Sequence, residues 1–281
     1  MIVNSVICPI CGAVMRESED NKSLVCLGGA RGNRERRFHC FDFSSSGYIN
    51  FALPSQSLSG DSKQAVASRT RFLEGGYYDP VRDAVCRAVE TYSAGGLVID
   101  AGCGEGYYTA ALANAAQAVI GVDLSKSGID AAAKRARRLK LKNALFAVAG
   151  IYGMPVADEC ADAVVSLFAP CAEQEFLRVL RPGGILVAVG AGEDHLLGLK
   201  RAVYDRVYKN EERADMPKNL VPIEKKEIKF EIDLPDSQTV KDLFSMTPYY
   251  YRTGERDMEK LNALSSLSTE VHVFVDVYRK K

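Results

Sequence analysis

The sequence has no net charge and no long hydrophobic run. Its 36 basic residues balance its 36 acidic residues. This balance excludes a uniformly basic protein of the histone kind, so any contact with nucleic acid must come from local basic patches. Apolar runs such as residues 97–99 fall far short of the roughly 20 residues that span a bilayer. We therefore expect no contact with a membrane.

A signal peptide is also missing. The first ten residues contain neither the basic segment nor the long apolar segment that secretion requires. We therefore expect a cytoplasmic protein, in which the eight cysteines are thiols or metal ligands rather than disulfides. The 281 residues, 47% apolar and 26% charged, predict one large globular domain or one domain with a small companion.

Half of the cysteines lie in the first forty residues. Cys8 and Cys11 belong to a CPxCG knuckle, in which a tight turn directs both sulfur atoms at one point. A tetrahedral zinc site needs a second pair of ligands, which Cys26 with either His39 or Cys40 can supply. Residues 1–52 contain few apolar residues and need such a cross-link to fold. We therefore predict a zinc-binding module there.

Two segments concentrate positive charge. Residues 28–37 contain three glycines, four arginines and one glutamate. Guanidinium groups can bind phosphates in bidentate fashion, which would suit RNA, and a solvated surface loop is the equally weighted alternative. Residues 134–142 are also basic, and for this helix a solvated face is favoured over a phosphate-binding flank.

The most informative motif follows a linker and two helices predicted within residues 53–92. Residues 97–100 form a short apolar strand that ends in Asp100, and a loop with Gly102, Gly104 and Gly106 then opens a helix. This is the nucleotide-binding turn of a Rossmann-like sheet, where glycines let the ligand approach the backbone. We place the catalytic domain in residues 93–281.

The details of this motif favour S-adenosylmethionine over a dinucleotide. Asp100 and Glu105 would repel a pyrophosphate but suit a ligand that carries an ammonium and a sulfonium group. Asp123 ends the next predicted strand, where its carboxylate can accept both ribose hydroxyls. The glycine loop with its strand, helix and second acid therefore predicts an S-adenosylmethionine site.

The remaining pattern alternates strands and helices. Further strands are predicted at residues 118–122, 144–148, 162–168, 185–189 and 270–278, which indicates an α/β fold. Residues 195–250 are predicted to form a cap over the substrate between the fifth and sixth strands.

Three residues near the expected substrate remain ambiguous from sequence alone. Phe168, at the end of the fourth strand, could stack on a flipped base or lie in the core. Cys171 is interpreted as structural, because no second motif supports a nucleophile. His195 follows the fifth strand, and its spacing alone slightly favours a helix-start residue without a role.

Taken in order, these motifs resemble the bacterial 23S ribosomal RNA (guanine-N1) methyltransferases. The resemblance covers essentially the whole chain. It rests on the CPxC start, on HCFD at residues 39–42, on RFLEGGYY at 71–78, on DAGCGEGYYT at 100–109, on residues 195–200 and on MTP at 246–248.

The resemblance implies methylation of one guanine at N1 in a hairpin of 23S rRNA, with S-adenosylmethionine and Zn²⁺ as cofactors. The family's zinc ligands fall on Cys8, Cys11, Cys26 and His39, and its cofactor contacts fall on Tyr78, Gly104, Glu105 and His195. The gap between Cys26 and His39 is longer than is usual in the family. Some members confer macrolide resistance. The sequence does not tell to which branch of the family this chain belongs, or whether it forms a homodimer.

Two other functions remain as alternatives. A zinc-containing methyltransferase of small molecules or proteins would share the glycine loop but would not need a basic zinc module. A non-catalytic zinc protein that binds RNA would not need the intact loop at residues 100–106. For the guanine reaction itself, no residue is marked as the base that removes the N1 proton.

Overall fold

The computed structural model describes residues 2–26, 28, 38–52, 60–211 and 217–281. Most of the predicted arginine segment, residues 29–37, and the first part of the predicted linker, residues 53–59, lie outside the described residues. Among the helices in the described part of the chain, none has both the length and the apolar character needed to cross a membrane.

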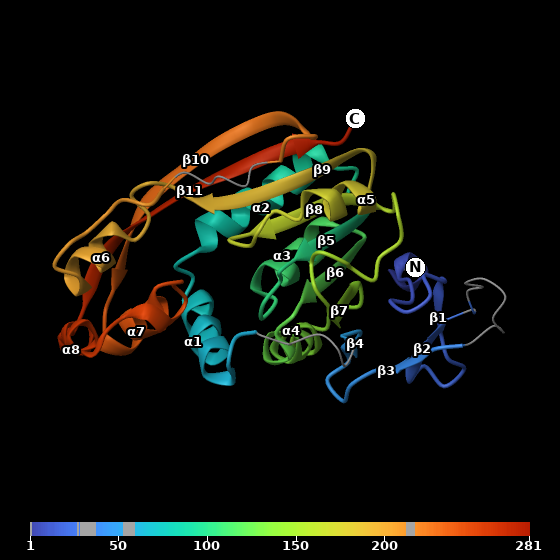
Figure 1. Cartoon of the computed structure of the whole chain (residues 1–281), viewed down its shortest axis with the longest axis horizontal. Helices are drawn as coiled ribbons and strands as arrows, with labels where there is room; N and C mark the ends of the chain where they lie inside the picture. Colours follow the sequence, from blue (N-terminus) through green and yellow to red (C-terminus); the bar gives the residue numbers. More distant parts are fainter. Residues whose placement is uncertain (1, 27, 29–37, 53–59, 212–216) are drawn as a thin grey trace.

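Short strands dominate the first fifty residues, and alternating strands and helices follow (Figure 1). The first group comprises η1 (Ile2–Ser5), β1 (Met15–Glu17), β2 (Ser23–Cys26), β3 (Cys40–Asp42) and β4 (Ile49–Asn50). The second comprises α1 (Lys63–Glu74), α2 (Asp79–Tyr92), β5 (Leu97–Ala101), α3 (Tyr107–Ala115), β6 (Ala118–Asp123), α4 (Lys126–Arg138), β7 (Ala144–Val148), β8 (Ala161–Leu167), α5 (Glu173–Val179) and β9 (Leu180–Ala191). The third comprises α6 (Leu197–Val203), β10 (Val221–Leu234), α7 (Ser237–Ser245), η2 (Tyr250–Arg252), α8 (Glu255–Ala263) and β11 (Leu267–Arg279).

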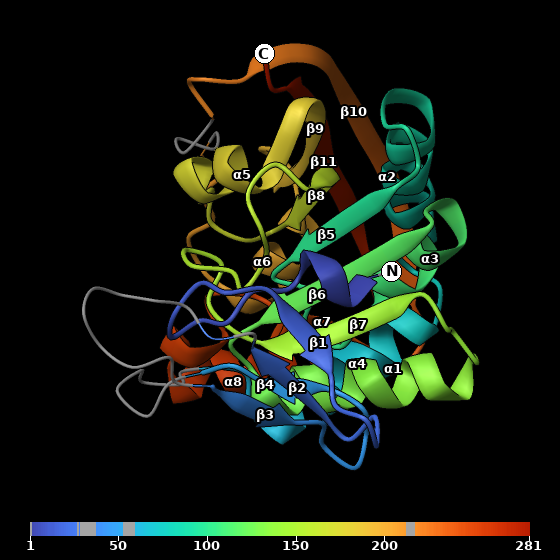
Figure 2. The ribbon, with the colours of Figure 1, turned by 90° about the vertical axis from the view of Figure 1, so that its right-hand side faces the viewer.

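An eight-stranded sheet in the order β10-β11-β9-β8-β5-β6-β7-β4 forms the centre of the molecule (Figure 2). The strands from β9 to β4 are parallel to their neighbours, whereas β11 runs antiparallel to both β9 and β10. All five residues of β5 are buried, as expected for a central strand covered on both faces. This is the Rossmann-like α/β arrangement predicted from the sequence.

The two faces of the sheet are covered by different partners. Along β9, Ile185, Val187 and Val189 point into one apolar cluster with α2 and α3, while Leu186 and Ala188 point into a second. The second cluster contains residues of α5 and of the described part of residues 1–52, which we call the cysteine-rich segment. This segment therefore packs directly against the sheet. Because side chains alternate between the two faces of a sheet, each strand contributes side chains to the apolar clusters on both faces.

The cysteine-rich segment and the catalytic sheet share backbone hydrogen bonds as well as a core. The Ile7 N–H donates to Pro155 O over 3.0 Å, and Val6 bridges Val156. Further along, β4 pairs with β7 and so becomes the edge strand of the large sheet. Residues 1–52, predicted as a separate module, therefore contribute one strand to the catalytic sheet.

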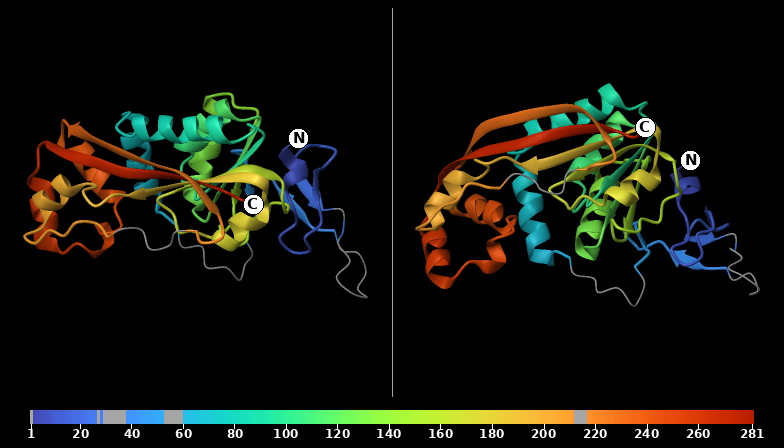
Figure 3. Two further views of the ribbon diagram at one scale, coloured as in Figure 1. Left: turned by 90° about the horizontal axis from the view of Figure 1, so that it is seen from above. Right: turned by 45° about the horizontal axis from the view of Figure 1, so that its top comes forward.

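The end of the molecule away from the cysteine-rich segment is formed by α6, α7 and α8, at the end of the β10–β11 hairpin (Figures 1 and 3). The predicted cap at residues 195–250 includes residues 221–234. These residues form β10, which pairs with β11 along almost its whole length. The long strand was missed because its burial alternates only weakly on an exposed sheet edge.

Candidate cofactor and metal sites

A cavity of ≈ 970 Å³ opens where β5, β6, β8 and β9 end. The loops after these strands form one wall, and α1, α7 and residues 246–251 contribute the opposite one. The cavity brings together all seven residues predicted to bind the cofactor: Tyr78, Asp100, Gly102, Gly104, Glu105, Asp123 and His195. Ligands of α/β proteins bind at this edge of the sheet, because the strand ends and helix starts meet there.

The glycine loop between β5 and α3 has the backbone that its sequence predicts. Gly102, Gly104 and Gly106 have φ angles of 86°, 54° and 80°, a region that favours glycine. A Cβ atom on Gly106 would also lie 2.8 Å from the Cβ of Ala132 in α4. The loop can therefore approach both a ligand and the neighbouring helix only with glycine at these positions.

Asp100 is the buried acid at the end of this loop's strand. Its side chain is 1% exposed, and burial raises the pKa of its carboxyl to about 7. The hydroxyl of Thr109 donates to Asp100 Oδ2 over 2.6 Å and opposes that rise. A cationic ligand group beside Asp100 would hold it in its ionised form. Sequence reasoning missed Thr109, although its place one turn into α3 directs it back towards the strand.

Asp123 lies at the end of β6 and also faces the cavity. The backbone N–H groups of Gly104 and Ser125 donate to its two carboxylate oxygens over 2.9 and 2.7 Å. Burial nevertheless raises the pKa of Asp123 above its usual value. These bonds fix the carboxylate beside the glycine loop, where the sequence predicted an acceptor for ribose hydroxyls.

Glu105 lies in the loop, but its carboxylate has a partner that the sequence did not reveal. Arg135 in α4 donates to Glu105 Oε2 over 2.6 Å, and the two side chains are only 9% and 2% exposed. Because Arg135 neutralises Glu105, Asp100 is the acid of this loop that can attract a cationic ligand. Arg135 is likewise no part of a solvated helix face or of a phosphate-binding flank.

Two other basic residues of α4 are also paired with acids. Lys134 contacts Asp130 at 2.7 Å, and Arg138 contacts Glu74 at 2.5 Å. These ion pairs reduce the charge that the helix offers to a phosphate. The preference for a solvated surface over a phosphate flank is therefore consistent with the geometry at these two residues.

Tyr78 and His195 meet at the other side of the cavity. Their Oη and Nε2 atoms are 3.3 Å apart, and the backbone N–H of His272 in β11 donates to His195 Nδ1 over 3.2 Å. Because Nδ1 accepts, the neutral ring carries its proton on Nε2 and donates it to Tyr78 Oη. Burial lowers the pKa of His195 to about 4, so this ring is neutral at pH 7. The phenol hydrogen of Tyr78 remains available to a ligand.

Phe168 and Cys171 follow β8 at the same edge. Phe168 lines the cavity and is 47% exposed, so it is not the core residue that one interpretation expected. Cys171 is partly buried and packs against the second apolar cluster. That packing agrees with a structural role for this thiol.

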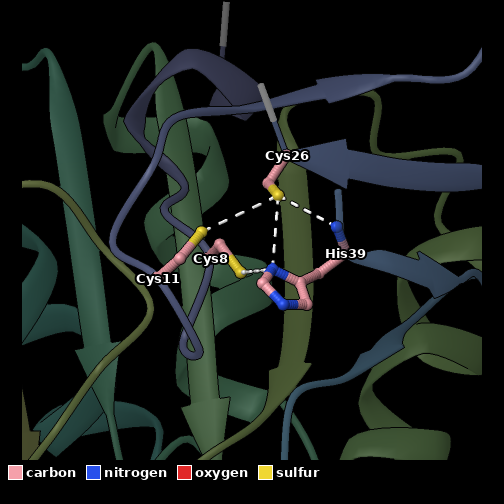
Figure 4. A group of neighbouring side chains, drawn as sticks. All are labelled: Cys8, Cys11, Cys26 and His39. Carbon is pink, nitrogen blue, oxygen red and sulfur yellow. Dashed lines mark hydrogen bonds between the residues drawn. The ribbon is translucent and has the colours of Figure 1, made fainter. Parts of the chain in front are cut away.

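The four predicted metal ligands Cys8, Cys11, Cys26 and His39 converge in the cysteine-rich segment (Figure 4). Their ligand atoms all lie within 4.8 Å of one another. His39 Nδ1 is 3.5 Å from the sulfur atoms of both Cys8 and Cys26, and the Cys11 and Cys26 sulfur atoms are 3.8 Å apart. A tetrahedral zinc ion with Zn–S bonds of about 2.3 Å separates its ligands by about this much.

The structure distinguishes His39 from Cys40, which the spacing had left open. The backbone N–H of His39 donates to Cys26 Sγ over 3.0 Å and so anchors the histidine beside the cluster. Cys40 is exposed and its sulfur lies 3.8 Å from Asp42 Oδ1 instead. His39 directly precedes β3, and its ring lies in the cluster, whereas the Cys40 side chain at the start of β3 lies outside it.

Comparisons with known proteins agree with this geometry. Residues 93–233 match the family described as "Methyltransferase domain". A Bacillus subtilis protein named "Putative 23S rRNA (guanine-N(1)-)-methyltransferase YxjB" is 30% identical over 280 residues, which cover 95% of this chain and 94% of that protein. The chain belongs to the 23S rRNA (guanine-N1) methyltransferase family.

Other relatives of this methyltransferase carry similar names. The "23S rRNA (guanine(748)-N(1))-methyltransferase" of Streptomyces fradiae is 30% identical, with 72% of this chain and 69% of that protein covered. A solved structure from Anaeromyxobacter dehalogenans, titled as "a Putative Type II Methyltransferase", superposes with a TM-score of 0.52 at 20% identity, covering 70% of this chain and 95% of that one. That likeness shows the methyltransferase fold alone.

Proposed function

We propose that this methyltransferase transfers the methyl group of S-adenosylmethionine to N1 of a guanine in a hairpin loop of 23S rRNA, with loss of the N1 proton and release of S-adenosylhomocysteine, and that it does so in the cytoplasm. The observation that carries the proposal is the conjunction of the cavity, which holds all seven predicted cofactor residues, with a Cys₃His cluster packed on the same sheet. A small-molecule methyltransferase needs the first feature but not the second.

The cofactor supplies an electrophilic methyl group on a sulfonium. We assign Asp100 to its ammonium group, because this buried acid gains most from a cation beside it. Asp123, held by two backbone N–H groups, is placed to accept the ribose hydroxyls. The Tyr78 hydroxyl, which accepts from His195, can donate to an anionic group of the same ligand.

These side chains act by position rather than by chemistry of their own. Binding the cofactor and the base side by side makes the transfer effectively unimolecular. Enclosure of both in one cavity also excludes water from the sulfonium. The glycine loop and the His272–His195–Tyr78 chain of hydrogen bonds hold this geometry before either ligand arrives.

A direct test incubates the full chain with tritiated S-adenosylmethionine and unmodified large-subunit RNA. Primer extension then locates the product, because a methyl group on guanine N1 blocks the Watson–Crick edge and stops the polymerase. We expect one stop in a hairpin loop, which also identifies the branch of the family. Label on another kind of base would overturn the N1 assignment, and cofactor binding without any label would favour the non-catalytic alternative. A macrolide susceptibility test of strains with and without the enzyme addresses resistance.

Zinc is the second part of the proposal, held by Cys8, Cys11, Cys26 and His39. We expect about one zinc per chain by elemental mass spectrometry, and loss of that zinc with weaker RNA binding in Cys11→Ser. Cys40→Ser is the matched control, since this nearby thiol is exposed and outside the cluster. A zinc content that Cys11→Ser leaves unchanged, or that Cys40→Ser abolishes, would contradict the ligand assignment.

A further inference from the structure

Exposed aromatic side chains of Phe168, Tyr152 and Tyr251 line the cavity, and the Phe168 ring contacts two of the predicted cofactor residues, Tyr78 and His195. Ligand pockets usually measure about 300–1,000 Å³, and this cavity, at ≈ 970 Å³, lies at the upper end of that range. Phe168 lines this cavity and is 47% exposed, whereas the residue before it, Leu167, is buried. A large apolar side chain exposed inside a cavity is available to contact a ligand.

The backbone at Phe168 has a conformation that its side chain disfavours. Its φ is 52°, in the left-handed region that a bulky residue rarely occupies. The Phe168 N–H donates to Val189 O over 2.9 Å and holds the residue at the end of the sheet. Backbone strain of this kind persists where the surrounding structure imposes it, and it gathers at ligand sites.

The ring itself is oriented by two residues of the cofactor site. It stacks on His195 at a centroid distance of 5.8 Å and an interplanar angle of 21°. Tyr78 meets it edge-on at 6.4 Å. The next residue, Ala169, lies so near the glycine loop that a Cβ on Gly102 would be 3.1 Å from the Ala169 Cβ. Phe168 thus lies beside residues predicted to bind the cofactor and faces the same cavity.

We propose that Phe168 is the stacking platform for the target guanine and sets the base in line with the methyl group. The inference rests on the proposed function and deepens it. An enzyme that acts on a base in a folded RNA must replace the stacking that the base loses when it leaves its neighbours. An aromatic ring held on one face by His195 provides that replacement on its exposed part. Phe168 is a positioning residue, and the methyl group comes entirely from the cofactor.

The test compares Phe168→Leu with Phe168→Tyr in the RNA methylation assay. Loss of one base–aromatic stack should lower kcat/KM for RNA roughly 10- to 100-fold in Phe168→Leu, while Phe168→Tyr stays within about threefold of the unsubstituted enzyme. The dissociation constant for S-adenosylmethionine, measured by calorimetry, should remain within about threefold in both. Phe230→Leu, which removes a ring on β10 outside the cavity, is the control and should leave both quantities unchanged.

A fluorescence measurement separates stacking from a merely structural role. The hairpin is made with 2-aminopurine at the position that primer extension identifies, because this base brightens when it leaves its stack and dims when it stacks on another ring. We expect a brighter complex with Phe168→Leu than with the unsubstituted enzyme. If Phe168→Leu binds no cofactor, Phe168→Met replaces it as a less disruptive change.

The outcomes distinguish this inference from the proposed function. Absence of N1-methylguanine with the unsubstituted enzyme would refute the function itself. Two other outcomes would refute the stacking platform and leave the proposed function intact. In the first, Phe168→Leu or Phe168→Met methylates guanine at the full rate. In the second, Phe168→Tyr fails to preserve the rate.

Discussion

The ion pair between Glu105 and Arg135 permits a prediction whose size follows from its burial. Arg135→Met would keep the length of the side chain but leave the Glu105 carboxylate, 2% exposed, without its 2.6 Å partner. Breaking a buried pair in this way costs about 3–5 kcal/mol. Arg135 also donates to the backbone carbonyl of Glu105 over 3.3 Å. Its ion pair with the partly exposed Glu74, also at 3.3 Å, contributes little.

Proton uptake sets a ceiling on this loss. A carboxyl with an ordinary pKa of about 4.3 can be protonated at pH 7 at a cost of about 3.7 kcal/mol, so the variant should lose about 3–4 kcal/mol of unfolding free energy. At pH 5 the same step costs only about 1 kcal/mol. Burial raises the pKa of Glu105 in the folded state above its value in the unfolded chain. The Glu105 carboxyl therefore contributes stability at a pH below its unfolded-state pKa, and this contribution is lost as the pH rises through its folded-state pKa. The variant should therefore approach the unsubstituted protein as the pH falls from 7 to 5.

Urea unfolding at pH 5 and pH 7 measures both quantities. The double variant Glu105→Gln with Arg135→Met is the control, because it removes the charge and its partner together and should cost clearly less than the single change at pH 7. A loss below about 1 kcal/mol at pH 7, or one of equal size at both pH values, would refute the reasoning.

Two further predictions concern the cofactor. Tyr78→Phe removes the acceptor of the His195 Nε2–H and should weaken S-adenosylmethionine binding roughly 5- to 30-fold in calorimetry, with little change in kcat at saturation; unchanged affinity would exclude the hydroxyl from the site. Because the pKa of Asp100 is about 7, a cationic ligand should bind more tightly as the pH rises from 5.5 to 7.5, and Asp100→Asn should bind weakly with a flat profile; an equal slope in the variant would assign the dependence to another group.

The parts of the site that could be predicted are those encoded within a few residues. The glycine loop, Asp100 and the CPxC turn each depend on local backbone geometry, and they lie where the sequence placed them. Whether His39 or Cys40 lies beside the three cysteines could not be told from their spacing, because it depends on where each side chain points in the folded chain. Contacts across long separations were beyond the sequence, above all the pair of Glu105 with Arg135, 30 residues away.

The fold shows the same division. The alternating segments from β5 to β9 were readable because each buried parallel strand is a short apolar run. β10 was not, since its side chains are largely exposed and charged, and no strand was predicted within the cap at residues 195–250. The role of His272 was equally hidden, because it holds His195 through a backbone N–H that carries no side-chain signal.

Because β4 pairs with β7, the cysteine-rich segment also completes the edge of the catalytic sheet, in addition to its proposed contact with RNA. An uncovered edge strand offers a row of free N–H and C=O groups to any other extended chain, and proteins avoid leaving a long one open. Here the two residues of β4 close the end of the sheet, and Ile49 and Phe51 are buried with it. A shortened enzyme without residues 1–52 would expose this edge and its apolar neighbours, so it should aggregate before any loss of RNA recognition could be observed.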